Sequence, residues 1–231
     1  MELPKGYKDL FYDGFLGNRA RNYLLKRNMN LKYLGSLGIG FCNEMDDEFF
    51  GYIIIPFKRE GLLVYYIGRD FMGNKLRYKN PAKDKVLTGK SECLFNEEAL
   101  YLYDKVYIVE GWADAVTFEG NGISSQGMGL SEWQLNKILF SDVKEVVFVP
   151  DVGAFYNWLQ YAEKFVETKK VKILDIQSYI LKNNLDTKMF KDVNALGLDV
   201  IKEIENNTDY LDYSNLIYLY GKQESYNSFA V

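Results

Sequence analysis

The chain has 231 residues, of which 48% are hydrophobic and 16% aromatic, so it is long enough to bury one large core or two small ones. It contains no histidine, which excludes Ser-His-Asp and Cys-His nucleophilic catalysis and the usual Cys/His zinc sites. Cys42 and Cys93 are too few for a disulfide scaffold, and the absence of a long apolar run or a signal-peptide pattern predicts a cytoplasmic protein without a membrane span.

Charge is unevenly distributed along the chain, although the net charge is only −4. Residues 1–93 carry 16 Lys and Arg against 11 Asp and Glu, whereas residues 94–231 carry 12 against 21. Segment 69–90 alone has seven basic and two acidic residues. This asymmetry suggests a first half that binds phosphate groups and a second half that attracts a metal ion. A solvated basic loop beside an acidic surface is the competing interpretation.

The first hundred residues predict a helix, a β-hairpin and a long loop. Apolar residues at helical spacing predict a helix over 16–30. Two runs rich in β-branched and aromatic residues, Tyr52–Phe57 and Leu62–Gly68, flank a charged turn and predict a hairpin. The basic segment 69–90 contains Gly-Asn and Asn-Pro pairs, which are typical of loops, with a short strand possible at Leu76–Lys79.

From Lys105 onward, strand-like and helix-like segments alternate. The expected strands are Val106–Val109, Ile123–Ser125, Glu145–Val149 and Val171–Ile176. The expected helices span 113–119, 132–140, 154–168 and 199–206. This alternation predicts a Rossmann-like parallel sheet with helices on both faces. The tail from Asp209 is rich in Tyr, Asn and Ser and is expected to be loosely ordered.

Three acids lie where such a sheet binds ligands, beyond the carboxyl ends of its strands. Glu110 follows the first of these strands, Asp151 follows the third, and Asp192 lies in the loop after the fourth. Clustered carboxylates repel one another unless a cation joins them, and hard oxygen ligands select Mg²⁺ or Mn²⁺. The competing interpretation is that each acid caps a following helix, which suits Glu110 least because glutamate is a poor N-cap.

The same acids carry a resemblance to the TOPRIM domain, which bacterial-type primases, topoisomerases and related nucleases share. In Val106–Ala115 a strand ends in Glu-Gly and Asp114 follows four residues after Glu110, as in the first motif of that family. Three later pieces resemble the turn after the first helix, the strand leading into the Asp-x-Asp motif, and the late Lys-Asp loop of primase versions: Ile123–Gly127, Val147–Asp151 and Lys191–Asn194.

The first half resembles the N-terminal subdomain of bacterial-type primase cores. The elements that carry this resemblance, in order, are Tyr23–Arg27, Leu37–Phe41, Gly51–Phe57, Gly61, Gly68-Arg69, Arg77–Pro81 and Lys90. Together the matching pieces cover about residues 15–200. The resemblance implies a smaller α+β primase subdomain over 1–103, a Rossmann-like TOPRIM domain with a parallel sheet over 104–205, and a C-terminal tail over 206–231.

The resemblance implies a DNA primase-like nucleotidyltransferase, a DNA-directed RNA polymerase that makes short RNA primers on single-stranded DNA from nucleoside triphosphates. It implies Mg²⁺ or Mn²⁺ as cofactor and no zinc. It implies catalytic roles for Glu110, Asp114 and Asp151, and metal ligation by Glu110, Asp151 and Asp192. The residues expected to contact template and nucleotides are Arg69, Arg77, Tyr78, Lys79, Asn80 and Lys90, with Tyr78 stacking on a base.

One acid of the Asp-x-Asp pair is missing, since the sequence reads Val149-Pro150-Asp151-Val152-Gly153. If Asp151 is the first acid, Gly153 replaces the second, and if Asp151 is the second, Val149 replaces the first. A two-metal site would lose affinity through this change. Two alternatives therefore stand beside the primase: a catalytically degenerate nucleic-acid-binding module of a replication complex, and a TOPRIM nuclease. We see no zinc-binding or helicase region, so a separate partner chain is expected to supply these functions. A phage origin, and hence the host cytoplasm, is the expected source.

Overall fold

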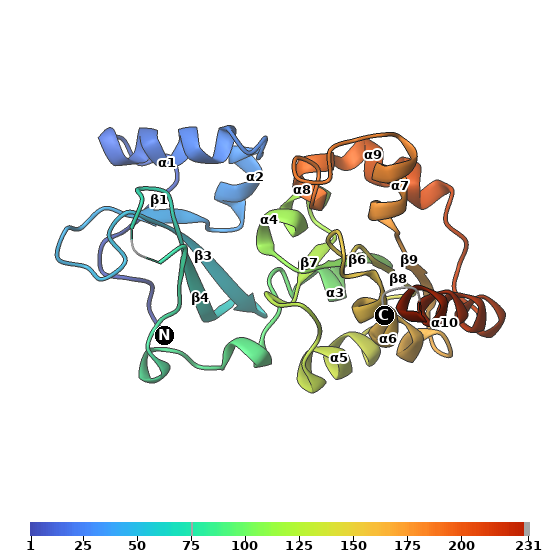
Figure 1. Ribbon diagram of the computed structural model, residues 1–231. Helices are drawn as coiled ribbons and strands as arrows, with labels where there is room; N and C mark the ends of the chain where they lie inside the picture. The colour runs from blue at the N-terminus through green and yellow to red at the C-terminus, as the bar shows by residue number, and fades with distance from the viewer. Residues whose placement is uncertain (75, 229–231) are drawn as a thin grey trace. The chain divides into compact units, whose positions relative to one another are not determined.

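The computed structural model describes residues 1–74 and 76–228. The chain divides into two compact units, Met1–Glu98 and Ala99–Val231. Each unit is built on its own sheet, one antiparallel and one parallel (Figure 1). Within the described ranges, no helix has both the length and the apolar character needed to cross a membrane.

The first unit contains a five-stranded antiparallel sheet of order β1-β2-β3-β4-β5. Its strands are Tyr7–Asp9, Gly40–Cys42, Tyr52–Arg59, Leu62–Asp70 and Tyr78–Lys79. The predicted hairpin is present as β3 and β4. Its two-residue turn has positive φ at both Glu60 (51°) and Gly61 (76°), the geometry that suits the right-handed twist of a hairpin.

The helix predicted over 16–30 is present but ends earlier than expected, and a second helix follows the predicted range. The helices are α1 (Phe15–Leu25) and α2 (Leu31–Ser36). The break contains Asn28, whose φ is 56°, and Asn30, whose side chain accepts a hydrogen bond from the Tyr33 N–H at 3.1 Å. Asparagine tolerates the left-handed region and caps helices well, so these residues end one helix and begin the next. Two 3₁₀ turns follow β5, η1 (Lys83–Lys85) and η2 (Lys90–Glu92).

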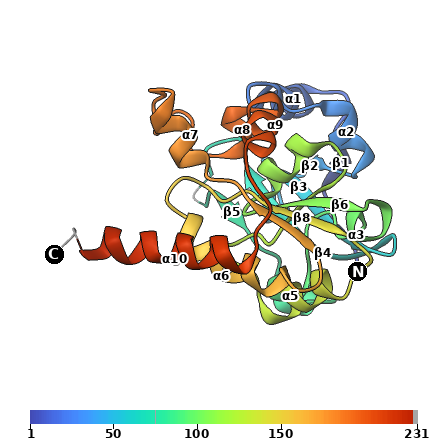
Figure 2. The same ribbon diagram turned by 90° about the vertical axis from the view of Figure 1, so that its right-hand side faces the viewer.

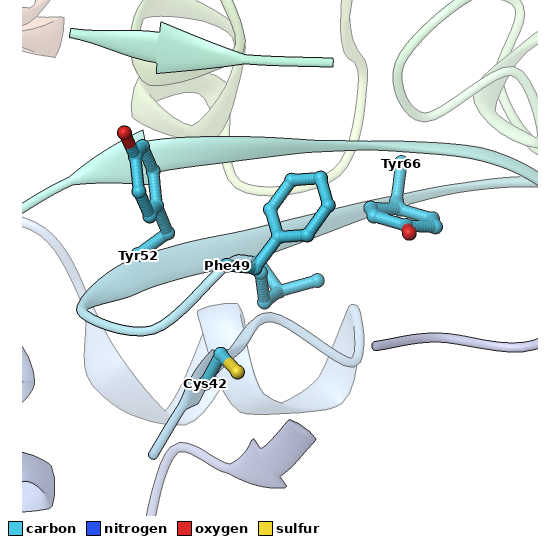
Figure 3. Close-up of a cluster of buried hydrophobic side chains, with 5 residues drawn as sticks. Cys42, Phe49, Tyr52 and Tyr66 are labelled. Atoms are coloured by element: carbon cyan, nitrogen blue, oxygen red, sulfur yellow. The ribbon is translucent and has the colours of Figure 1, made fainter. Parts of the chain in front are cut away.

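Aromatic packing fills part of the core of this unit (Figure 3). The cluster consists of Cys42, Phe49, Tyr52, Ile54 and Tyr66. The rings of Phe49 and Tyr66 meet edge to face, with centroids 5.2 Å apart. A Cβ on Gly68 would lie only 2.8 Å from the Phe49 ring, so a glycine is needed where β4 passes this ring. Burial raises the pKa of the Cys42 thiol to about 12, so this cysteine is a packing group.

The second unit contains a four-stranded parallel sheet of order β7-β6-β8-β9. In chain order its strands are β6 (Lys105–Val109), β7 (Gly122–Ser124), β8 (Glu145–Phe148) and β9 (Lys170–Ile173). The predicted Rossmann-like parallel sheet is thus confirmed. Because β7 and β8 lie on opposite sides of β6, the direction of strand addition reverses between β6 and β8. Open α/β sheets bind ligands at this reversal, beyond the carboxyl ends of the strands.

The helices of this unit precede, connect or follow the strands. They are α3 (Ala99–Leu102), α4 (Trp112–Ala115), η3 (Val116–Phe118), α5 (Glu132–Leu139), α6 (Phe155–Ala162), η4 (Glu163–Phe165), α7 (Ile176–Lys182), α8 (Val193–Leu196), α9 (Leu198–Asn206) and α10 (Tyr213–Ser228). The strand predicted to reach Ile176 ends earlier, because Asp175 caps α7 by accepting the Ser178 N–H at 2.9 Å.

The tail expected to be loosely ordered contains α10, whose first turns lie beside α6 (Figure 2). Two tyrosines on this helix hold it there. The Tyr213 hydroxyl donates to Glu167 at 2.6 Å, and the Tyr220 hydroxyl donates to Glu163 at 2.7 Å. The tyrosines of the segment that suggested loose order instead supply hydrogen bonds that hold α10 to Glu163 and Glu167.

Candidate active site

Two acids follow neighbouring strands at the point where strand order reverses. Glu110 follows β6, and Asp151 follows β8 after a Val-Pro pair. The strands pair in parallel with Ile108 opposite Phe148, and the Val149 N–H continues the ladder by donating to the Ile108 carbonyl at 2.9 Å. Both acids therefore leave the sheet at the same edge.

Glu110 is half-buried and held by two donors. The indole N–H of Trp158, from α6, donates to its Oε1 at 3.1 Å, and the backbone N–H of Asp151 also bonds its carboxylate. Burial raises the pKa of Glu110, and these hydrogen bonds oppose the rise. The carboxylate is thus fixed in orientation by the helix that follows the strand of the second acid.

Asp151 is the most perturbed acid of this edge. Its Oδ1 is buried and has no hydrogen-bond partner. Burial raises its pKa to about 8, with further contributions from the charges of Asp114, Glu110 and Asp192, while Lys191 acts against them. Four carboxyl groups therefore lie close enough to interact electrostatically around one unsatisfied oxygen.

Helix capping explains one of the three predicted strand-end acids but not the other two. At the starts of α4 and α6 the cap positions are Gly111 and Ala154, and neither helix has a side-chain cap. Glu110 and Asp151 are thus free of that structural role. Asp192 does cap α8, since its Oδ1 accepts the Ala195 N–H at 2.9 Å. The capping interpretation holds for Asp192.

The start of α8 also fixes Asp114. This side chain is only 7% exposed, and its Oδ1 accepts the Asn194 N–H at 3.0 Å. The first turn of α8 thereby links the acid of α4 with Asp192, the residue that caps the same helix. Sequence patterns identified the acids but not Asn194 or Trp158, whose partners lie 80 and 48 residues away. The indole of Trp158 followed the apolar spacing of α6 and gave no separate signal.

If Asp151 is the first acid of the pair, the position of the missing second acid, Gly153, is open. Gly153 has a φ of 87°, and a Cβ built on it would have no other atom within 4 Å. Its N–H donates to Oε1 of Gln177, in α7, at 3.0 Å. The space for a second Asp-x-Asp carboxylate is therefore present, although the backbone there favours glycine.

Among residues 1–74 and 76–228, no three acidic or cysteine side chains are arranged as a metal-binding group. The donor chemistry nevertheless fits a hard divalent cation, because carboxylate oxygens are its preferred ligands. The unpartnered Asp151 Oδ1 and the repulsion that raises its pKa are the two features that a cation would relieve.

In the first unit, three of the residues predicted to contact nucleic acid lie together. Arg69, on β4, pairs in register with Tyr78, on β5, and its guanidinium lies 4.8 Å from the centre of the Tyr78 ring. The guanidinium of Arg77 lies 5.9 Å from the same ring. Arg69 Nε donates to the Tyr23 hydroxyl at 2.7 Å, whereas its Nη1 is buried without a partner. An unsatisfied guanidinium N–H is suited to a phosphate oxygen.

The other residues of this segment that were predicted to contact nucleic acid are Lys79, Asn80 and Lys90. Lys79 and Asn80 have partners within the unit. Lys79 donates to the Glu48 carbonyl at 2.6 Å and pairs with its carboxylate at 3.2 Å. Asn80 accepts the Tyr65 hydroxyl at 3.1 Å. Lys90 is exposed on η2. Lys79 and Asn80 thus position the segment around Tyr78.

Comparison with known proteins identifies the fold. No family model and no curated protein sequence matches the chain. Among solved structures, the E. coli primase catalytic core is similar at a TM-score of 0.65 and 15% identity, over 89% of this chain and 77% of that one. A DNA primase domain from Pseudomonas aeruginosa gives 0.65 and 17%, over 88% and 76%. The DnaG primase catalytic domain bound to single-stranded DNA gives 0.64 and 15%, over 88% and 75%.

Proposed function

We propose that this chain, which has the fold of the DnaG primase catalytic core, is a primase-like nucleotidyltransferase. It would make short RNA primers on single-stranded DNA from nucleoside triphosphates, with Mg²⁺ or Mn²⁺. The observation that carries the proposal is the unpartnered, buried Oδ1 of Asp151 among three further carboxyl groups at the reversal of the parallel sheet.

In this proposal Glu110, Asp151 and Asp192 hold the metal ion. When bound, the ion neutralises charge on the triphosphate and favours attack by the primer 3′-hydroxyl. Trp158 keeps Glu110 oriented. Asp114, on α4, adds its carboxylate to the same acidic edge and holds the start of α8 by accepting the Asn194 N–H. These fixed positions reduce the reorganisation needed when substrate binds.

The basic segment is proposed to bind template and nucleotides. Arg69 and Arg77 contact phosphates, Tyr78 stacks on a base, and Lys90 adds a mobile charge. Lys79 and Asn80 contribute by holding the segment through Glu48 and Tyr65. We propose that the domain over 1–103 binds template and nucleotides and that the domain over 104–205 holds the metal ion. The tail over 206–231 takes no part in the chemistry. A separate helicase or zinc-module chain is the proposed partner.

A catalytically degenerate binding module is the second candidate, and Gly153 is the observation that favours it. Without a carboxylate at that position, the acidic edge offers fewer ligands than a two-metal site requires. Such a module would keep the cluster of Arg69, Arg77 and Tyr78, here called the Arg69 cluster. It would bind single-stranded DNA without synthesis.

A primer-synthesis assay tests the proposal against both alternatives. The full chain is incubated with single-stranded template, labelled ribonucleotides and Mg²⁺ or Mn²⁺, beside Glu110→Gln. We expect short RNA from the unaltered chain and at least about a hundredfold less from the variant, because a metal ligand is lost. Template degradation would instead support the nuclease, and binding without synthesis or cleavage the degenerate module.

Arg69→Ala is expected to weaken binding of single-stranded DNA. The variant loses one phosphate contact and the cation between Tyr23 and Tyr78, so the affinity should fall about tenfold and the slope of log K against log[salt] by about 0.7. Fluorescence anisotropy of a labelled oligonucleotide across a salt series measures both. Lys182→Ala, which removes an exposed lysine of the second unit, is the control, and an equal loss there would contradict the prediction.

A further inference from the structure

A long segment of the first unit contains no acidic residue. Between Gly14 and Asn43 the sequence has no Asp or Glu, although the whole chain has 32 of them. The segment includes α1 and α2 and carries five basic residues, Arg19, Arg21, Lys26, Arg27 and Lys32. Such a stretch attracts anions, and the carboxylate nearest to α1 in sequence is the exposed Asp13, just before the stretch.

The outward face of α1 is made of cations, amides and apolar groups. Its buried side is formed by Gly17, Ala20 and Leu24. The exposed positions recur at three- and four-residue steps and are Phe15, Asn18, Arg19, Asn22, Leu25 and Lys26. Among the described residues of the first unit, no helix or strand lies over the outer side of α1 in Figure 1. Each polar side chain on this face is a cation or an amide.

Three aromatic rings are exposed at the start of this face. Phe15 is 73% exposed, Phe11 53% and Tyr12 47%. The guanidinium of Arg19 lies 5.8 Å from the centre of the Phe15 ring, and the Lys8 ammonium lies 5.3 Å from that of Tyr12. Rings with cations beside them are the combination that binds bases and phosphates of single strands.

The loop that carries two of these rings is held firmly. Arg21 Nη1 donates to the Leu10 carbonyl at 2.8 Å and to the Tyr12 carbonyl at 3.2 Å. A Cβ on Gly35 would lie 2.7 Å from the Phe11 ring, so the glycine allows that ring to lie against α2. The aromatic groups are therefore exposed by a fixed backbone, which lowers the entropic cost of binding.

Tyr23, on the flank of α1 between its buried and exposed sides, reaches the Arg69 cluster, since its hydroxyl accepts the Arg69 Nε–H. We infer that the outer face of α1, together with Phe11 and Tyr12, is a second contact surface for single-stranded nucleic acid. This surface extends the strand-binding region proposed above, and the inference rests on that proposed function. The strand's phosphates pair with Arg19 and Lys26, and its bases stack on the exposed rings.

Single-stranded nucleic acid fits this face better than an acidic protein segment does. A carboxylate-rich peptide would pair with Arg19 and Lys26 but would not need a group of exposed aromatic rings. A flexible strand uses both features, because each nucleotide offers an anion and a flat base. The amides of Asn18 and Asn22 donate and accept, as base edges and sugars require.

The test is anisotropy with a fluorescein-labelled oligo(dT) of about 20 nucleotides, long enough to cover more than one contact region. Arg19→Ala/Lys26→Ala is expected to weaken binding about tenfold and to lower the salt slope by about 1.4, which corresponds to two phosphates. Phe15→Ala is expected to weaken binding about tenfold at an unchanged salt slope, because stacking releases no counterions. All three side chains are exposed, and circular dichroism confirms that the variants fold.

Lys182→Ala/Lys202→Ala removes the same charge from exposed positions of the second unit and should leave the salt slope unchanged. Unaltered oligo(dT) binding in the α1 variants, or an equal loss in this control, overturns the inference. Loss of binding in the α1 variants supports it even if no primers are made, in which case the proposed function alone fails. Primer synthesis combined with unaltered binding in these variants overturns the inference alone.

Discussion

Asp151→Asn is expected to remove metal-dependent synthesis while making the metal-free protein more stable at alkaline pH. The side chain contributes a buried, unpartnered oxygen among acids, so it is suited to a cation and costly without one. Asparagine has nearly the same shape but carries no charge. We expect primer synthesis to fall at least about a hundredfold, as for the loss of any metal ligand.

The stability effect follows from the raised pKa of Asp151. The pKa of an aspartate in an unfolded chain is about 4, whereas burial and the neighbouring carboxylates raise the pKa of the folded Asp151 to about 8. Between these values the folded chain binds more protons than the unfolded chain, so the free energy of unfolding falls as pH rises, and the loss is complete above about pH 8. Asp151→Asn removes this term. It should be more stable than the unaltered chain by up to about 5 kcal/mol at pH 9, because the difference between pKa values of about 4 and about 8 corresponds to that free energy, and equal to it near pH 4.

Thermal melts across this pH range, with EDTA or with MgCl₂, measure the difference. Added Mg²⁺ should raise the melting temperature of the unaltered chain at pH 8 and have little effect on the variant, because only the former binds the ion. Asp209→Asn, at an exposed position with no predicted role, is the control and should follow the unaltered chain. A variant as sensitive to pH as the unaltered chain would show that Asp151 is not the responsible group.

Local sequence features were sufficient to predict those parts of the site that consist of one strand and the acid that follows it. The apolar runs before Glu110 and Asp151 predicted β6 and β8, and the carboxyl-end rule predicted that both acids lie at one edge of a parallel sheet. Asp192 lies near the same edge, since its charge contributes to the raised pKa of Asp151, but it does not directly follow the strand β9. A helix, α7, lies between the two, because Asp175 begins it with a side-chain cap.

The remaining parts of the candidate site depend on partners distant in sequence. Lys79 belongs to a basic segment and was predicted to contact nucleic acid, yet Glu48 lies close enough to bind it. Trp158 fits an apolar helix face, and only the folded sheet brings its N–H to Glu110. Propensity and spacing contain no information about such pairs, since tertiary packing decides which side chains meet.

A buried ionic cluster at the opposite end of the parallel sheet should contribute strongly to stability. Glu205, on α9, is 6% exposed. It pairs with the ammonium of Lys105, at the start of β6, and accepts the Tyr107 hydroxyl at 2.7 Å. Burial, followed by this hydrogen bond, raises the pKa of Tyr107 to about 12, so the phenol remains a donor at neutral pH. The cluster fixes α9 against the strand that carries Glu110.

Glu205→Ala is therefore expected to lower the free energy of unfolding of the second unit by about 2 kcal/mol. It leaves the Tyr107 phenol without its acceptor, and it leaves Lys105 paired with Glu145 alone, at 3.3 Å. Glu205→Gln keeps an acceptor for Tyr107 and should cost less. All three tryptophans, Trp112, Trp133 and Trp158, lie in this unit, so their fluorescence during urea unfolding reports on it separately from the first unit.

Glu203→Ala, at an exposed position on the same helix, is the matched control and should change stability by less than about 1 kcal/mol. If Glu205→Ala cost no more than this control, α9 would not be held by the cluster. If it destabilises the unit as expected, primer synthesis below the unfolding temperature should still persist. Glu205, on α9, pairs with Lys105 at the start of β6, whereas Glu110 follows the end of that strand. The two acids would then be separated by role: Glu205 supports the sheet, and Glu110 serves the chemistry at its other edge.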